Sequence, residues 1–256
     1  MINRVSAVAW NTFRESVRDR VFYLVAVFGF IVLGSSAVLS PLTIGAQSKI
    51  VADVGLGSMS LFGLLVVIFV GCSMLHKELD KRTITTILTK PISRREYLFG
   101  KYCGLSLTLF GMLLVMALLF VLITFMTPGG MHLSYVTAFY LIFLELLLVT
   151  AAVMFFSSFV SPVLAAVFTI GLFVIGHLSE DLMQFGQLMG SAFQSGLSKL
   201  AYYVIPNLEL FNVRGDVVHG VQVTSAHVML ATLYGLCYMT LLIVCAGAIL
   251  ARKELK

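Results

Sequence analysis

The sequence predicts an all-α integral membrane protein, on the basis of its apolar content, its long apolar runs and the placement of its basic residues. Of its 256 residues, 59% are apolar and only 11% are charged, and the mean hydropathy is +1.01. A soluble domain typically has about 25% charged and about 45–50% apolar residues. A chain of this length cannot bury so much apolar surface in a water-soluble core, so we expect the lipid bilayer to be its solvent.

Six apolar segments are predicted to cross the membrane as helices, since about 20 apolar residues are needed to span the hydrocarbon core. In chain order the segments are Val21–Leu39, Met59–Leu75, Cys103–Met126, Leu133–Phe156, Pro162–Leu178 and Val228–Ala251. The second and fifth segments are short. The fifth is expected to start at Pro162, because proline suits the first turn of a helix.

The basic residues predict which side of the membrane each loop faces. Six spans place both chain ends on one side, and cytoplasmic loops of membrane proteins are enriched in Lys and Arg. With both ends in the cytoplasm, 14 of the 17 Lys and Arg residues are cytoplasmic and only Lys49, Lys199 and Arg214 are external. We therefore expect a multi-pass protein of the cell (inner) membrane with cytoplasmic termini, whose basic residues do not indicate a nucleic-acid partner.

Two segments outside the spans are predicted to contain helices. In residues 1–20, apolar residues recur at helical spacing and predict an amphipathic helix on the cytoplasmic membrane surface, with an ordinary juxtamembrane tail as the alternative. These apolar residues are Ile2, Val5, Ala9, Phe13 and Val17. Residues 179–226 are predicted to form a small external helical cap before the sixth span, because Ser179 followed by two acids is typical of a helix start.

The cytoplasmic loop 76–101, between the second and third predicted spans, is the most distinctive polar segment. It contains 7 of the 17 Lys and Arg residues. Ile84, Ile87 and Leu88 share one face at i, i+3, i+4 spacing, which predicts a short helix with a narrow apolar stripe. Pro91 ends this helix, because the residue before a proline disfavours the α region.

A second helix is predicted to begin directly after this proline. Ser93 and Glu96 match a capping box, and Gly100 and Gly104 permit close packing of the span that follows. A short helix between two spans can insert into a cytoplasmic partner and carry its movement into the membrane. Alternatively, the basic residues only follow the positive-inside rule, which leaves the apolar stripe, the proline and the capping box unexplained.

The polar residues of this loop occur in a characteristic order. In sequence they are Glu78, Arg82-Thr83-Ile84, Leu88, Lys90-Pro91, Ser93-Arg94, Glu96 and Gly100-Lys101. This order resembles the loop of type-2 ABC transporter permeases, although many members have a Gly-Thr pair where this chain has Arg82-Thr83. The predicted layout and the stretch Tyr202–Arg214 resemble these permeases as well, so the resemblance covers residues 1–256 as one permease domain.

The resemblance implies a coupling helix in loop 76–101 and a partnership with other subunits. Two permease copies, identical or related, would pair in the membrane, and two cytoplasmic ABC ATPase subunits would dock beneath them. The residues implied in docking are Glu78, Arg82, Thr83, Ile84, Ile87, Leu88, Pro91, Arg94 and Lys101. An extracytoplasmic accessory protein is a further candidate partner.

The nucleotide is expected to bind elsewhere than in this chain. No GxxxxGK[ST] phosphate loop occurs in the sequence, and that loop is what cradles the phosphates of ATP in P-loop ATPases. We therefore expect a subunit that is not itself an enzyme and has no cofactor of its own, with ATP and Mg bound by the partner ATPase.

Glu145 is the only acid that the sequence places deep within a predicted span. A charge at the centre of a bilayer costs about 2.5–3.5 kcal/mol on insertion scales. We therefore expect Glu145 to be protonated or to accept hydrogen bonds from a Ser, Thr or Tyr of a neighbouring helix. Two interpretations stay open, namely a contact to substrate or a proton, and a polar clasp between helices.

Two further functions are compatible with parts of the sequence. A non-transporting membrane anchor of an ATPase-linked complex would share every feature except a substrate pathway. A membrane-embedded enzyme using Glu145 is less well supported, because the sequence indicates neither a second buried acid nor a histidine partner. No metal site is expected, since the five histidines lie near span ends or outside the membrane and none has HExxH spacing.

Overall fold

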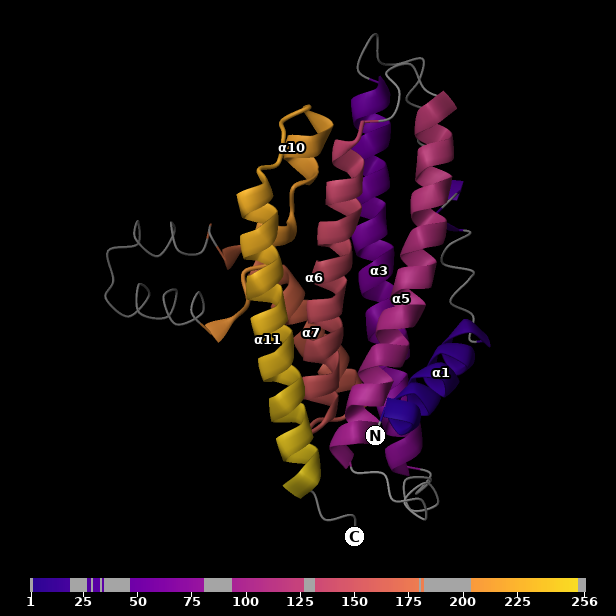
Figure 1. The fold of residues 1–256 in the computed structure, drawn as a ribbon, viewed down its shortest axis with the longest axis vertical. Helices are drawn as coiled ribbons and strands as arrows, with labels where there is room; N and C mark the ends of the chain where they lie inside the picture. Colours follow the sequence, from indigo (N-terminus) through magenta and orange to yellow (C-terminus); the bar gives the residue numbers. More distant parts are fainter. Residues whose placement is uncertain are drawn as a thin grey trace, which may run out of the picture.

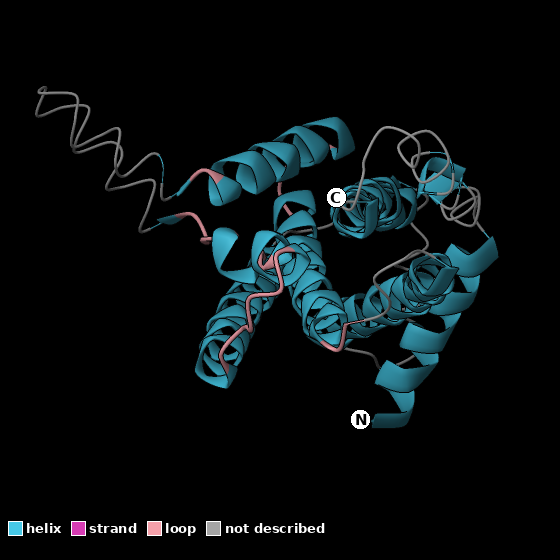
Figure 2. Ribbon diagram, turned by 90° about the horizontal axis from the view of Figure 1, so that it is seen from above, coloured by secondary structure: helices cyan, strands magenta, loops and turns pink. Residues whose placement is uncertain are grey.

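The computed structural model describes residues 2–18, 27–28, 30–32, 34, 47–80, 94–126, 132–179, 181 and 204–252. Within these residues every regular element is a helix, as the sequence predicts (Figures 1 and 2). The helices are α1 (Ile2–Arg18), α3 (Gln47–Asp80), α5 (Arg94–Met126), α6 (Ser134–Ser157), α7 (Pro162–His177), the 3-10 helix η2 (Glu209–Phe211), α10 (Arg214–Val218) and α11 (Ser225–Arg252).

Four of the described helices are long and apolar enough to cross a membrane. The candidate spans are Ser48–Cys72 in α3, Glu96–Phe125 in α5, Ser134–Ser157 in α6 and Ser225–Arg252 in α11. The fifth expected span, α7, is apolar but has only 16 residues. The first expected span, Val21–Leu39, lies mostly outside the described residues, so the total of six spans stays a prediction.

The helix boundaries agree best with the sequence where turn residues mark them. Helix α6 starts and ends within one residue of the expected segment Leu133–Phe156. Helix α7 begins at Pro162, as predicted, after an extended Ser161. Helix α3 begins well before the expected Met59, because hydropathy marks where the apolar residues start, whereas the helix also includes the polar turns around Lys49 and Asp53.

Helix α6 is the centre of the bundle. It packs against α3, α5, α7 and α11, and Figure 1 shows α3, α5 and α11 standing beside it along the long axis. Close helix packing in membranes depends on small residues, because lipid is as apolar as the side chains themselves. Gly71 of α3 provides one such contact, since a Cβ atom there would lie only 2.7 Å from Cγ1 of Val153.

Helix α1 crosses the N-terminal end of α5 (Figure 1). Thr12 and Ser16 of α1 are fully buried, whereas Trp10 is 61% exposed. Among the described side chains, this buried face differs from the predicted apolar stripe, whose residues Val5 and Ala9 meet α5 through their backbone carbonyl oxygens. The difference arises because α1 packs through small residues, and a hydropathy pattern does not identify such a face.

The described part of the expected external cap, residues 204–224, packs into the helix bundle. Its apolar residues Leu208, Phe211, Val213 and Val217 are buried. The backbone N–H of Leu208 donates to the carbonyl of Gly176 near the end of α7, at 3.0 Å. This segment therefore packs against the end of α7 as part of the bundle, and its α10 lies at the upper end in Figure 1.

Candidate functional site

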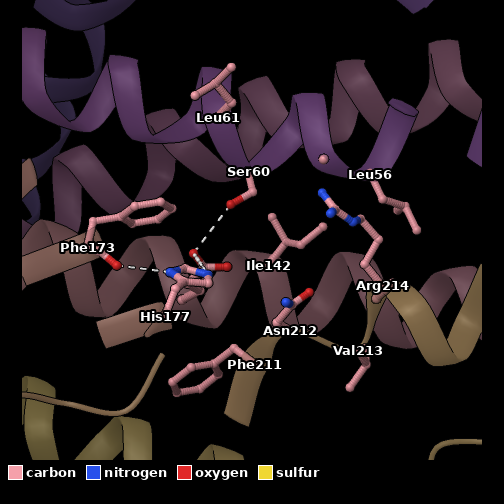
Figure 3. Close-up of a pocket in the computed structure, with 13 residues that line it drawn as sticks. Leu56, Ser60, Leu61, Ile142, Phe173, His177, Phe211, Asn212, Val213 and Arg214 are labelled. Atoms are coloured by element: carbon pink, nitrogen blue, oxygen red, sulfur yellow. Dashed lines mark hydrogen bonds and ion pairs between the residues drawn. The ribbon is translucent and has the colours of Figure 1, made fainter. Parts of the chain in front are cut away.

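A pocket of about 250 Å³ lies between α3, α6, α7 and the chain that leads into α10. Its polar lining residues, drawn in Figure 3, are Ser60, Glu145, His177, Asn212 and Arg214. Apolar side chains, including Phe173 and Phe211, complete the wall. A few polar groups converging in an apolar cavity are typical of a binding site for a small molecule.

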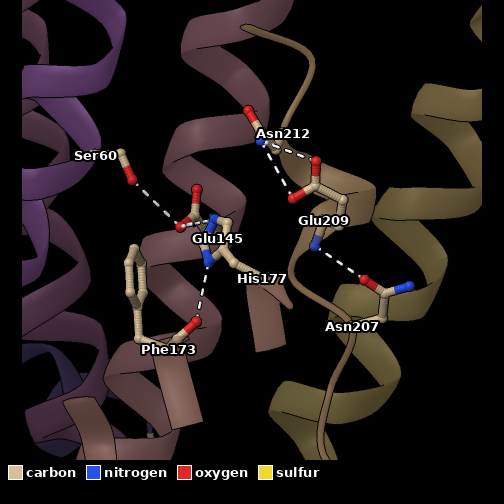
Figure 4. Close-up of polar contacts among 7 residues, drawn as sticks. All are labelled: Ser60, Glu145, Phe173, His177, Asn207, Glu209 and Asn212. Atoms are coloured by element: carbon tan, nitrogen blue, oxygen red, sulfur yellow. Dashed lines mark hydrogen bonds and ion pairs between the residues drawn. The ribbon is translucent and has the colours of Figure 1, made fainter. Parts of the chain in front are cut away.

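Glu145 lies halfway along α6 and is 2% exposed. The hydroxyl of Ser60 on α3 donates to its Oε1 at 3.3 Å. This contact provides the kind of neighbouring donor that the sequence analysis expects for a buried carboxyl group. In Figure 4 the dashed line from Ser60 ends on one of the two carboxylate oxygens of Glu145.

His177, the last residue of α7, is the second partner of Glu145. Its Nε2 lies 3.5 Å from Oε1 of Glu145, and its side chain is 24% exposed. The expectation that Glu145 has no histidine partner is therefore wrong. The two residues lie on different helices, so a search for acids and histidines at the spacing of a single helix could not find them.

Arg214, the first residue of α10, closes one side of the pocket. Its Nε lies 2.9 Å from Oδ1 of Asp53 on α3. A Cβ atom at Gly57, one turn further along α3, would collide with Nη1 of Arg214. The absence of a side chain at Gly57 therefore gives the guanidinium group its place against α3. The sequence predicts only that Arg214 lies in an external loop, and its position in the pocket could not be predicted from charge placement.

Asparagine side chains fix the path of the chain between α7 and α10 (Figure 4). Oδ1 of Asn207 accepts a hydrogen bond from the N–H of Glu209 at 2.9 Å. Nδ2 of Asn212 donates to both carboxylate oxygens of Glu209, at 3.0 and 3.2 Å. The hydroxyl of Tyr234 on α11 accepts from the N–H of Asn207 at 2.8 Å. These contacts hold Asn212 and Arg214 at the pocket.

A second close contact lies at the other end of the bundle, where α1 crosses α5. A Cβ atom at Gly100 would lie 2.8 Å from Cβ of Val8, and one at Gly104 would lie 2.5 Å from Cβ of Thr12. The expected role of these two glycines in close packing is confirmed. Their partner is α1, which packs against the start of α5 at both glycines.

The family of the chain follows from a comparison with known families. Residues 6–255 match the family described as ABC-2 family transporter protein. The chain belongs to the ABC-2 transporter family. This ABC-2 permease is therefore a multi-pass transmembrane subunit of a transporter, as the resemblance of its polar loop indicates. A comparison with curated proteins found no match.

The docking residues expected in the permease lie at the junction of α3 and α5. Glu78 belongs to the last turn of α3, and Arg94 is the first residue of α5. Lys101 is buried in α5, with its Nζ 5.7 Å from the ring centroid of Tyr97. The docking role of all nine residues stays a prediction, and the remaining six lie outside the described part of the chain. These are Arg82, Thr83, Ile84, Ile87, Leu88 and Pro91.

Helix α5 of the permease begins at Arg94 and has Glu96 in its first turn. Ser93 lies outside the described residues, so the capping box stays a prediction. Within the described residues of the permease, no three His, Cys, Asp or Glu side chains are grouped so that they could hold a metal ion.

Proposed function

We propose that this permease works in an ATP-driven transporter, and that separate cytoplasmic ATPase subunits supply the energy through loop 76–101. The observation that carries the proposal is the family match, which spans residues 6–255. The absence of a phosphate loop in the sequence supports the binding of ATP by another subunit. ATP and Mg bind to the partner ATPase, and this chain forms the substrate path across the membrane.

The packing of the described helices supports a route for the movement. The proposed docking segment connects the end of α3 with the start of α5. Helix α5 is in contact with α1 through Gly100 and Gly104, and α3 contributes Ser60 to the pocket. A displacement of this junction would shift α3 relative to α6, and with it the Ser60–Glu145 hydrogen bond.

The proposed assembly contains two permease copies, identical or related, above two ATPase subunits. Large apolar side chains remain exposed on the long helices, for example Leu118 and Phe125 of α5 and Leu241 of α11. Lipid and a second permease are the proposed neighbours of these faces. Crosslinking through single cysteines on α5 and α11 in membranes would give a dimer if the proposal holds, and monomers only would refute the paired arrangement.

The direct test of ATPase docking is copurification. The permease would be expressed with an affinity tag together with the ABC ATPase encoded beside it, and the proposal predicts that the two copurify. Changing Ile84, Ile87 and Leu88 to Asp together should abolish this association. As a control, Val221→Asp, at an exposed residue between α10 and α11 and away from the loop, should leave it intact. Unchanged copurification of the triple variant would contradict docking at this loop.

A further inference from the structure

The orientation of His177 fixes the position of its ring proton. Nδ1 lies 3.0 Å from the carbonyl oxygen of Phe173, one turn earlier on α7. A carbonyl oxygen can only accept a hydrogen bond, so Nδ1 must carry the proton. In a neutral ring, Nε2 then presents a lone pair, and this is the atom that lies 3.5 Å from Oε1 of Glu145 (Figure 4).

This geometry requires a proton between the two side chains. A carboxylate oxygen and an imidazole lone pair that face each other repel, whereas one proton makes the contact attractive. The pair then consists either of a protonated Glu145 and a neutral His177, or of a carboxylate and an imidazolium. Both forms hold one proton and have no net charge, which suits a site where Glu145 is 2% exposed.

The other charged groups near the pair each have a partner of their own. Arg214 forms its ion pair with Asp53 on α3, and Glu209 accepts two hydrogen bonds from Asn212. Ser60, also on α3, contributes a hydroxyl group without charge. Glu145 is the only charged residue of α6, and His177 is the only histidine of α7, which contains no acid, Lys or Arg.

We infer that Glu145 and His177 together form a binding site for one exchangeable proton, and that this proton holds the end of α7 against α6. The pocket gives the proton its access, since both residues line it and His177 is partly exposed. Loss of the proton leaves an unbalanced negative charge and separates the two side chains. The site goes beyond ATPase coupling and does not depend on it.

The sign of the pH dependence follows from counting protons. A free glutamate loses its proton at about pH 4.3 and a free histidine at about pH 6.5. Above both values the unfolded chain holds neither proton while the clasped pair holds one, so stability falls as the pH rises. Below both values the unfolded chain holds two protons against one, so stability falls as the pH decreases. Maximal stability is expected between these limits.

The test is the thermal unfolding of the full permease in detergent, without an ATPase, followed by circular dichroism from about pH 5 to about pH 9. On the alkaline side, one linked proton changes the unfolding equilibrium constant by up to about tenfold per pH unit. Glu145→Gln should remove this alkaline component, because its amide can donate to Nε2 without exchanging a proton. His177→Asn should instead move the start of this fall in stability from about pH 6.5 to about pH 4.3, because the unfolded chain then has no imidazole at this position that binds a proton while the buried Glu145 keeps its own. This second variant keeps the test decisive if the first does not fold.

Tyr140→Phe provides the matched control. Its hydroxyl contacts that of Thr232 at 3.0 Å between α6 and α11, away from the pair, so its loss should lower stability without changing the pH profile. Parallel pH profiles of the wild-type and either pair variant would overturn the proton site. Because no ATPase takes part, this outcome would leave the proposed transport function unaffected, and a failed copurification would likewise leave the proton site unaffected.

Discussion

Arg214 and Asp53 form an ion pair that joins the start of α10 to α3, with Nε of the arginine 2.9 Å from Oδ1 of the aspartate. The arginine also lines the pocket that contains Glu145. The two side chains are 45% and 52% exposed, so water screens the pair. The ion pair therefore holds the wall of the pocket in place and adds little to the global stability of the protein.

Reversing either charge of this pair should weaken the attachment of α10 to α3. Exposed ion pairs contribute about 0.2–1 kcal/mol, so Arg214→Asp and Asp53→Arg should each lower the melting temperature slightly. The double variant with the charges exchanged should recover part of the loss. Asp216→Asn, at an exposed acid of α10, is the control. A double variant no more stable than the sum of its single changes would show that the pair does not contribute.

A large side chain at Gly104 should displace α1. A Cβ atom there would lie 2.5 Å from Cβ of Thr12 and 2.6 Å from the carbonyl oxygen of Ala9, and overpacking typically costs about 1–3 kcal/mol. Trp10 is the only tryptophan of the chain and lies on α1. Its fluorescence should therefore change in Gly104→Leu.

Gly111 of the same helix provides the control for this experiment. A Cβ atom there has no neighbour within 4 Å among the described residues, so Gly111→Leu should leave the fluorescence of Trp10 unchanged. An equal response to both substitutions would contradict the packing of α1 at Gly104.

A side chain at Gly176 should release the segment that follows α7. A Cβ atom there would lie 2.7 Å from Cγ of Leu208 and 2.9 Å from the carbonyl oxygen of Pro206. Gly176→Val should therefore increase the labelling of a cysteine introduced at the buried Val213. Gly171→Val is the control, because a Cβ atom at Gly171 meets none of the described atoms within 4 Å. Equal labelling of Val213→Cys in both backgrounds would argue against this docking.

The helices and their order could be predicted from the sequence because their signals are local. The apolar run of α6 and the proline at the start of α7 each depend on a few neighbouring residues, and both predicted starts agree with the structure. The need of Glu145 for a polar partner was predictable from the cost of burying a carboxyl group in lipid.

Which residues contact Glu145 was not predictable, because these contacts join distant parts of the chain. Glu145 is 85 positions from Ser60, and His177 lies on another helix beyond a turn. No periodicity of one sequence brings such pairs together. The face of α1 was missed for a different reason, since the buried residues Thr12 and Ser16 are small rather than strongly apolar.

The decisive measurement for energy transfer through loop 76–101 is the ATPase rate with and without the permease. The rate of the ATPase mixed with the purified permease would be compared with that of the ATPase alone and with that of the ATPase mixed with the permease that carries the Ile84, Ile87, Leu88 and Arg94 substitutions together. The account predicts that binding of the permease changes the rate and that the combined substitution abolishes this change. An identical rate in all three preparations would contradict energy transfer through this loop.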